Sequence, residues 1–268
     1  MNFPATLVVG YGNMAGAMVS GWLGAGVPAA RFTVYHPHGK QVPEGVGLVS
    51  EFPERPVEAV LLGVKPAVLD AVAPGLAGAV GAGTLLVSVL AGVELASLRQ
   101  RFPQAGAIVR LMPNLACALG KSPNALVADR IDAEQRTVVT GMAELLGSAE
   151  WLEGEDLFDL VTALAGSGPG FVYRFIDALG LAAARLGLPT EQAQRLAVQM
   201  VEGAAALAAA STESPAELAR RVASPGGMTQ RGLDVLDRDD ALVELMVETL
   251  RAARDRGAEM AREARRRG

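Results

Sequence analysis

The stretch TLVVGYGNMAGAM, residues 6–18, joins a short apolar run to a glycine-rich turn and the start of an apparent helix. Gly10, Gly12 and Ala15 give the spacing G-x-G-x-x-A. In a strand–turn–helix unit, the first glycine makes the tight turn, the second admits a pyrophosphate, and the third small residue allows close packing. The helix N-terminus offers free N–H groups to an anion. We predict a dinucleotide site formed by Gly10, Gly12, Asn13, Met14 and Ala15; the alternative is a glycine turn without a ligand.

Short runs rich in Val, Leu and Ile recur through the first half of the chain and alternate with helix-like stretches. Such runs are typical of strands buried on both faces of a parallel sheet. The repeated units predict an α/β fold, a doubly wound (Rossmann) parallel sheet domain over residues 1–154. The expected strands are 6–10, 32–35, 59–64, 84–90 and 107–113, and the expected helices are 13–25, 66–79, 92–102 and 132–147.

Strand signals stop near residue 155, and the rest of the chain predicts an all-helical C-terminal domain over residues 155–268. Two expected helix starts have the spacing of a capping box. They are Ser214 with Glu217 in this domain, and Asp132 with Gln135 in the first domain. The Ala- and Leu-rich helices carry more apolar surface than a domain of ~115 residues covers alone, which predicts at least a homodimer. The expected helices are 155–165, 169–187, 190–210, 215–222, 229–238 and 240–266.

Composition narrows the class of protein. The net charge of −5 argues against a nucleic-acid binder, and the longest apolar runs are too short to cross a membrane. The N-terminus lacks the basic segment of a secretory signal, and Cys117 is the single cysteine. We therefore expect a soluble cytoplasmic protein without disulfides, in which Cys117 is a small buried hydrophobe. One cysteine and two neighbouring histidines give poor ligand spacing for zinc, so no metal site is expected.

The residues after the second expected strand bear on the choice of cofactor. An NAD site usually places Asp or Glu about 20 residues after the glycine motif, to bind the ribose 2′-hydroxyl. Residues 1–43 contain no carboxylate, and His36, His38 and Lys40 stand at this place instead. The 2′-phosphate of NADPH would lie near Lys40 and the two histidines, with no carboxylate to repel it. This favours NADPH as the cofactor, with NADH as the second choice. The alternative is that these are ordinary loop residues.

Further segments resemble the pyrroline-5-carboxylate reductase family, in order and over nearly the whole chain. They are LLGVKPAVL (61–69), VRLMPNLACALG (109–120), TALAGSGPGFVY (162–173) and SPGGMTQRGLDVLD (224–237). The resemblance implies NAD(P)H-dependent reduction of 1-pyrroline-5-carboxylate, a small cyclic imine, to L-proline, the last step of proline biosynthesis. It also implies a homodimer through the helical domains, sometimes assembled into a decamer. The positions that match the family's cofactor contacts are Ser50, Val64, Lys65, Pro66, Val89, Leu90 and Ala91. His36 is a cofactor candidate from the basic stretch described above. Asn114 could hydrogen-bond near the nicotinamide; the alternative is that an Asn after Pro simply makes a turn.

The SPGGMT stretch cannot continue a helix, and we interpret it as a substrate loop. Gly226 and Gly227 let an anion approach backbone N–H groups without a Cβ in the way. We predict that Ser224, Gly226 and Gly227 hold the substrate carboxylate. Thr229, in the following helix, would hydrogen-bond the imine nitrogen and is the candidate catalytic residue. The alternative is a helix stop with a Ser or Thr cap.

Because of several departures from the family pattern, the sequence does not decide the identity of the substrate. Leu115-Ala116-Cys117, Lys121 and Met228 replace common family residues near the expected cleft. A related imine reductase of different ring specificity therefore remains an alternative, as does a non-catalytic NAD(P)-binding regulator. A β-hydroxyacid-type dehydrogenase would need a lysine early in the second domain, and residues 122–268 contain none.

Overall fold

The computed structural model describes the backbone of residues 3–267 and the side chains of residues 3–265. The chain forms two compact units: unit 1 is Met1–Ser167 with Arg251–Gly268, and unit 2 is Gly168–Leu250. The strands end at Trp151, just before the expected boundary at residue 154, whereas unit 1 continues through the next helical turns.

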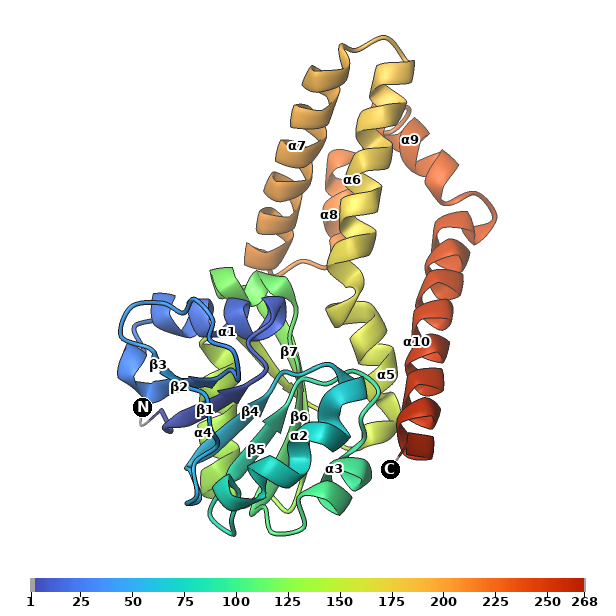
Figure 1. Cartoon of the computed structure of the whole chain (residues 1–268). Helices are drawn as coiled ribbons and strands as arrows, with labels where there is room; N and C mark the ends of the chain where they lie inside the picture. Colours follow the sequence, from blue (N-terminus) through green and yellow to red (C-terminus); the bar gives the residue numbers. More distant parts are fainter. Residues whose placement is uncertain (1–2, 268) are drawn as a thin grey trace. The chain divides into compact units, whose positions relative to one another are not determined.

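An eight-stranded sheet forms the centre of unit 1 (Figure 1). Its order is β3-β2-β1-β4-β5-β6-β7-β8, and every neighbouring pair is parallel except β6 with β7. The predicted doubly wound sheet is confirmed, although β3, β7 and β8 were not predicted. The strands are β1 (Thr6–Val9), β2 (Phe32–Tyr35), β3 (Gly47–Val49), β4 (Ala59–Leu62), β5 (Leu85–Ser88), β6 (Ala107–Met112), β7 (Ser122–Asp129) and β8 (Gly147–Trp151).

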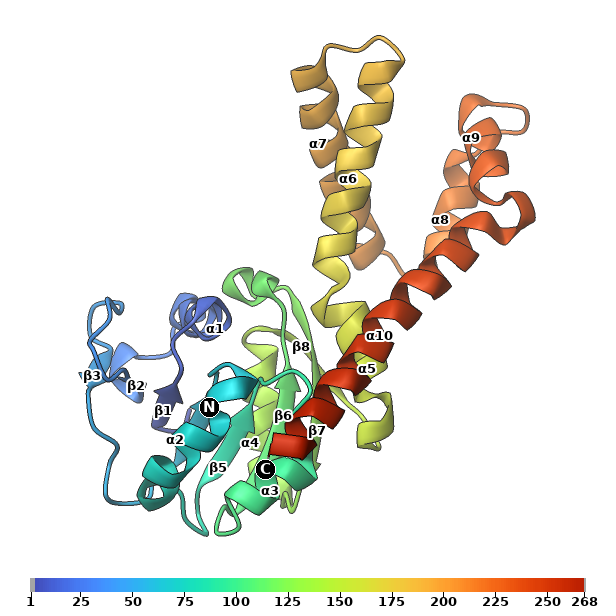
Figure 2. The same ribbon diagram turned by 45° about the vertical axis from the view of Figure 1, so that its right-hand side comes forward.

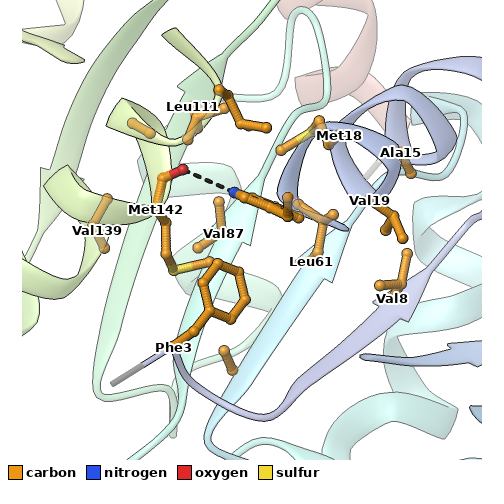
Figure 3. Packing of buried hydrophobic residues seen from close by; sticks show 14 of the residues in the cluster. Phe3, Val8, Ala15, Met18, Val19, Leu61, Val87, Leu111, Val139 and Met142 are labelled. Carbon is orange, nitrogen blue, oxygen red and sulfur yellow. Dashed lines mark hydrogen bonds between the residues drawn. The ribbon is translucent and has the colours of Figure 1, made fainter. Parts of the chain in front are cut away.

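Helices cover both faces of this sheet. They are α1 (Asn13–Gly24) and α4 (Ala133–Glu144) on one face, and α2 (Leu69–Leu76) and α3 (Leu95–Arg101) on the other. In Figure 3, helix residues Met18, Val19, Val139 and Met142 surround strand residues Val8, Leu61 and Val87. The dashed line there ends at the Met142 carbonyl, which accepts a 2.8 Å hydrogen bond from Trp22 Nε1. This bond joins α1 to α4 across 120 residues of sequence.

Short helical turns make most of the remaining connections in unit 1. They are η1 (Ala29–Arg31), η2 (Pro66–Val68), η3 (Ala77–Ala79), η4 (Leu115–Leu119), η5 (Glu155–Leu157), α5 (Phe158–Val161) and the π-helical turn η6 (Thr162–Gly166). The expected helix over residues 66–79 is therefore divided into η2, α2 and η3. The capping box of Asp132 and Gln135 forms at the start of α4, as predicted.

Unit 2 is entirely helical in its described part, as predicted for this region. It contains α6 (Gly168–Arg185), α7 (Thr190–Ala210), α8 (Pro215–Val222), α9 (Met228–Leu236), η7 (Arg238–Asp240) and the first residues of α10 (Ala241–Arg267). Helices α6 and α7 lie side by side (Figure 1 and Figure 2). A Cβ on Gly180 would lie only 3.4 Å from Gln194 Cα, so glycine permits this close approach. The Ser214–Glu217 capping box also forms.

Unit 2 buries little apolar surface. Among its described residues, Ala193 and Ala197 are the only buried apolar side chains. Large apolar side chains on these helices are exposed instead, including Val172, Tyr173, Phe175, Leu196, Met200 and Leu207. Exposure on this scale is typical of a surface that is covered by another chain.

The C-terminal part of α10 packs on the loop after β5, within unit 1. Gly92 in this loop has φ +70°, and a Cβ there would lie 2.7 Å from the Met260 Cβ. Arg265 also forms an ion pair of 3.3 Å with Glu94. Gly92 is therefore required twice, for its backbone conformation and for the approach of α10.

We expect Gly92→Ala to destabilise the protein more than Gly26→Ala. Gly26 also has a positive φ, +89°, but a Cβ there has no neighbour within 4 Å. Gly26→Ala therefore measures only backbone strain, about 1–2 kcal/mol. Gly92→Ala adds the clash with Met260, which should cost about 1–3 kcal/mol more. Chemical denaturation at one protein concentration measures both losses, and equal losses would contradict the packing described for α10.

Candidate active site

The carboxyl ends of the parallel strands meet at one edge of the sheet. The register pairs Val9 with both Tyr35 and Leu62, and Leu62 with Ser88. The order reverses between β1 and β4, which is where open α/β sheets bind their ligands. The loops and first helical turns that leave this edge carry every predicted cofactor residue: Gly10, Gly12, Asn13, Met14, Ala15, His36, Ser50, Val64, Lys65, Pro66, Val89, Leu90, Ala91 and Asn114.

We call the segment that directly follows a strand its exit. The exits of β1 and β4 are in direct backbone contact. Gly10 has φ +93°, and a Cβ there would lie 2.4 Å from Val64 N. A Cβ on Gly63 would lie 2.8 Å from Gly10 O and 3.1 Å from the Ala15 Cβ. Gly10 and Ala15 therefore serve the packing functions expected of them. Gly63 was not singled out from the sequence, although its place before VKP at the end of an apolar run was a usable signal.

Gly12 differs from Gly10 because neither its backbone conformation nor its neighbours in the protein require a glycine. Its φ of −87° is ordinary, and a Cβ would have no neighbour within 4 Å. Gly12 is also the N-cap of α1, where no side chain caps the helix. The open space thus lies beside unpaired N–H groups at the start of a helix, an arrangement that fits a pyrophosphate. The residues present fit a dinucleotide cofactor.

A basic loop after β2 is tied to the glycine loop. Lys40 Nζ donates a 2.6 Å hydrogen bond to Tyr11 O, and lies 5.9 Å from the centre of the Tyr11 ring. The His38 N–H donates to His36 Nδ1 at 3.3 Å. Burial raises the pKa of Tyr11, which keeps its hydroxyl neutral at physiological pH. A lysine cation is thereby held beside the turn that would receive the phosphates.

The β4 and β5 exits border a pocket of about 280 Å³. Lys65, Pro66 and Ala91 line it, and Met260 of α10 contributes to its wall. Leu90 is only 2% exposed, so its side chain belongs to the core and is not available to a ligand.

A buried ion pair holds the loop that leads from β5 to α3. Arg110 Nη1 lies 2.7 Å from Glu155 Oε1, and the Arg110 side chain is 3% exposed. The same oxygen accepts the Leu95 N–H at 2.8 Å, and the guanidinium lies 3.9 Å from the Phe158 ring centre. The sequence analysis did not identify this pair; its only signal was a charge inside the apolar run AIVRLMP.

Asn114 follows β6 at the same edge, but its side chain has protein partners. Nδ2 donates to Ala165 O at 2.9 Å, and Oδ1 accepts the Ala116 N–H at 2.9 Å. The second bond caps η4, so the turn that the sequence offered as the alternative to a cofactor contact does form.

The predicted substrate residues lie together in unit 2, between α8 and α9. Gly226 has φ +71° and open space around it, and the Gly227 N–H donates to Ser224 O at 2.8 Å. Gly227 is the N-cap of α9, and Thr229 is the second residue of that helix. Ser224, Gly226 and Thr229 are exposed. The segment is a turn that presents the start of a helix to its surroundings.

Other chemistries have little support among the described residues. Cys117 is buried, and this burial raises the pKa of its thiol to about 11, so the nucleophilic thiolate is scarce at neutral pH. No group of three or more His, Cys, Asp or Glu side chains in the described part of the chain could hold a metal ion. The described helices include none that is both long and apolar enough to span a membrane.

The reversed strand order, the glycine turn and the open helix start define a Rossmann-type dinucleotide-binding protein with an added helical unit. Comparison with known proteins narrows this class. Residues 155–260 match the family model for pyrroline-5-carboxylate reductase dimerisation. Two whole-length relatives at 30% identity or more, described next, show that the chain belongs to the pyrroline-5-carboxylate reductase family.

Over 97% of its length the chain is 36% identical to a pyrroline-5-carboxylate reductase of Pseudomonas aeruginosa, of which it covers 98%. It is 30% identical to pyrroline-5-carboxylate reductase 2 of Bacillus subtilis, over 94% of this chain and 93% of that protein. The solved structure of the reductase from Coxiella burnetii is 29% identical, has a TM-score of 0.86, and covers 97% of this chain and 99% of that one.

The two glycines of the motif should separate cofactor binding from stability. Gly10→Ala places a Cβ against the Val64 backbone, so we expect a loss of about 3 kcal/mol or more in the free energy of unfolding. Gly12→Ala fills only the open space, so its stability should change by less than about 1 kcal/mol while NADPH affinity falls about tenfold or more. Thermal unfolding and fluorescence titration with NADPH check this. Wild-type NADPH affinity in Gly12→Ala would show that the space is not the cofactor cradle.

Proposed function

We propose that this protein reduces 1-pyrroline-5-carboxylate to L-proline with NAD(P)H, the last step of proline biosynthesis. The observation that carries the proposal is the open space beside Gly12, at the start of α1. It occurs in a chain that is related over 97% of its length to a pyrroline-5-carboxylate reductase. Bound NAD(P)H supplies the hydride that reduces the C=N bond. The imine takes its proton from solvent, and the chain's own residues supply binding and orientation.

The cofactor residues hold the dinucleotide along the sheet edge. Gly10, Gly12 and the start of α1 bind the pyrophosphate, while His36, Lys40 and Ser50 surround the adenosine ribose. The exits of β4 and β5, residues 64–66 and 89–91, line the remainder of the cofactor. The Lys40 cation tied to Tyr11 supports NADPH as the preferred form, because it lies beside the glycine turn and no carboxylate precedes Glu44.

The SPGGMT turn holds the substrate. The Ser224 hydroxyl, the Gly226 N–H and the first N–H groups of α9 bind the carboxylate. The Gly227 N–H does not itself bind the carboxylate, because it already donates to Ser224 O. Thr229 hydrogen-bonds the protonated imine nitrogen and holds that proton in place during hydride transfer. A protonated imine is already an electrophile, and proximity supplies about 7–11 kcal/mol, so no His or Lys from the helical region is needed.

We further propose that the protein is a cytoplasmic homodimer joined through its helical units, with a decamer as the higher assembly. The exposed apolar side chains of α6 and α7 and the dimerisation match over residues 155–260 support the dimer.

Supplied with 1-pyrroline-5-carboxylate, the purified protein should oxidise NADPH and form L-proline in equal amounts. Spectrophotometry and chiral chromatography measure the two changes, with Gly12→Ala as the control for non-specific reduction. Cyclic imines of other ring sizes form a second arm. Turnover of another ring with none of the five-membered substrate would instead identify an imine reductase of different specificity.

The native protein should have a higher kcat/KM with NADPH than with NADH. His36→Asp should lower the ratio of the two values by about tenfold, because a carboxylate repels the 2′-phosphate. His36→Asn at the same position removes the imidazole without adding charge, and should lower the ratio less. A native preference for NADH would exclude this assignment of the basic loop.

Thr229→Ala should lower kcat by about tenfold to several hundredfold with little change in melting temperature, since a transition-state hydrogen bond is lost. Thr229→Ser keeps the hydroxyl and should retain most of the activity. A helix-cap role predicts the opposite pattern for Thr229→Ala, a stability loss of about 1 kcal/mol with kcat within about twofold.

A further inference from the structure

The last residues of the first segment of unit 1 form a rare type of helical turn. In η6 the Ser167 N–H donates to Thr162 O at 2.9 Å, a bond that spans five residues. The Thr162 hydroxyl donates to Phe158 O at 2.7 Å and joins η6 to the preceding turn. Such π-turns are rare and frequently mark functional sites. This one contains the first residues of AGSGPG and leads directly into α6.

Asn114 attaches this π-turn to the sheet edge. Its Nδ2 group donates to Ala165 O at 2.9 Å, across 51 residues of sequence. The residue is 5% exposed, and its main-chain N–H donates to Ser122 Oγ at 2.9 Å. Beside this bond, a Cβ on Gly166 would lie 3.4 Å from Met112 Cγ, so the turn also packs on the end of β6. Asn114 is therefore a buried residue whose side chain holds one carbonyl of η6.

We propose that Asn114 is a positioning residue that fixes η6, and with it the segment leading into α6, for the hydride-transfer reaction. The inference rests on the proposed function. Each polar atom of the Asn114 side chain already has a protein partner, so we assign its effect to the bond with Ala165 rather than to contact with the cofactor. Misplacement by about 1 Å can cost about a hundredfold in rate, which makes kcat the sensitive quantity.

Asn114→Asp isolates the bond to Ala165. A carboxylate can still accept the Ala116 N–H, but it has no donor for the Ala165 carbonyl and repels it. We expect kcat to fall about tenfold or more while the Kd for NADPH, measured by fluorescence, stays within about twofold. Hydrogen exchange at residues 162–168 should become faster. Lowering the pH from about 8 to about 6 should restore part of kcat relative to wild type, because burial raises the pKa of the new carboxyl and its protonated form regains an O–H donor.

Two further variants make the test decisive. Asn114→Ser keeps a hydroxyl that can cap η4 but cannot reach Ala165, so it should lose kcat without recovery at low pH. Ser122→Ala removes the acceptor of the Asn114 N–H and leaves the bond to Ala165, so its kcat should stay within about twofold of wild type.

The proposal is overturned if Asn114→Asp and Asn114→Ser keep kcat within about twofold. It is also overturned if NADPH affinity falls as much as kcat, which would indicate a direct cofactor contact, or if exchange at residues 162–168 is unchanged. Failure of the proposed function appears differently: the wild-type protein would not turn over the imine, while exchange in η6 would still respond to Asn114→Asp.

Discussion

The contact between the exits of β1 and β4 is the constraint on which the site depends. With Gly10 at φ +93° and its Cβ position 2.4 Å from Val64 N, no other residue fits there. Gly63 and Ala15 extend the same close packing to the start of α1. The two strand exits, the helix N-terminus and the GVKP segment are thereby brought to one place at the reversal point of the sheet. The open space beside Gly12 is the part of this arrangement that the protein does not fill.

The two units divide the physical tasks of the chain. Unit 1 contains the large buried side chains, such as Trp22 and Phe102, and therefore has a core of its own. Unit 2 buries alanines and exposes large apolar side chains, so its helices need another surface to cover them. Buried polar contacts then fix the loops at the sheet edge: Glu155 holds Leu95, and Asn114 holds Ala165. Stability and site geometry thus depend on different interactions.

Local signals explain what the sequence could predict. The core strands β1, β4, β5 and β6 are mostly apolar and buried throughout, the glycine motif is contiguous, and each capping box joins residues three positions apart. Strand β7 was missed because Pro123 and Asn124 argue against a strand, although the buried Asn124 Nδ2 group donates to Ala143 O and Ser148 O. Strand β8, GSAEW, is largely polar, and β3 has three residues. Asn114 with Ala165, and Arg110 with Glu155, could not be paired because their partners lie 51 and 45 residues away.

The most direct test of the account is a single-turnover reaction with NADPH deuterated at both C4 positions of the nicotinamide. Mass spectrometry and NMR of the product locate the label. If the hydride passes directly from the cofactor to the imine, L-proline will contain a single deuterium, on the ring carbon that was doubly bonded to nitrogen. Proline without deuterium, or deuterium at any other carbon, would contradict direct hydride transfer and with it the assignment of this site.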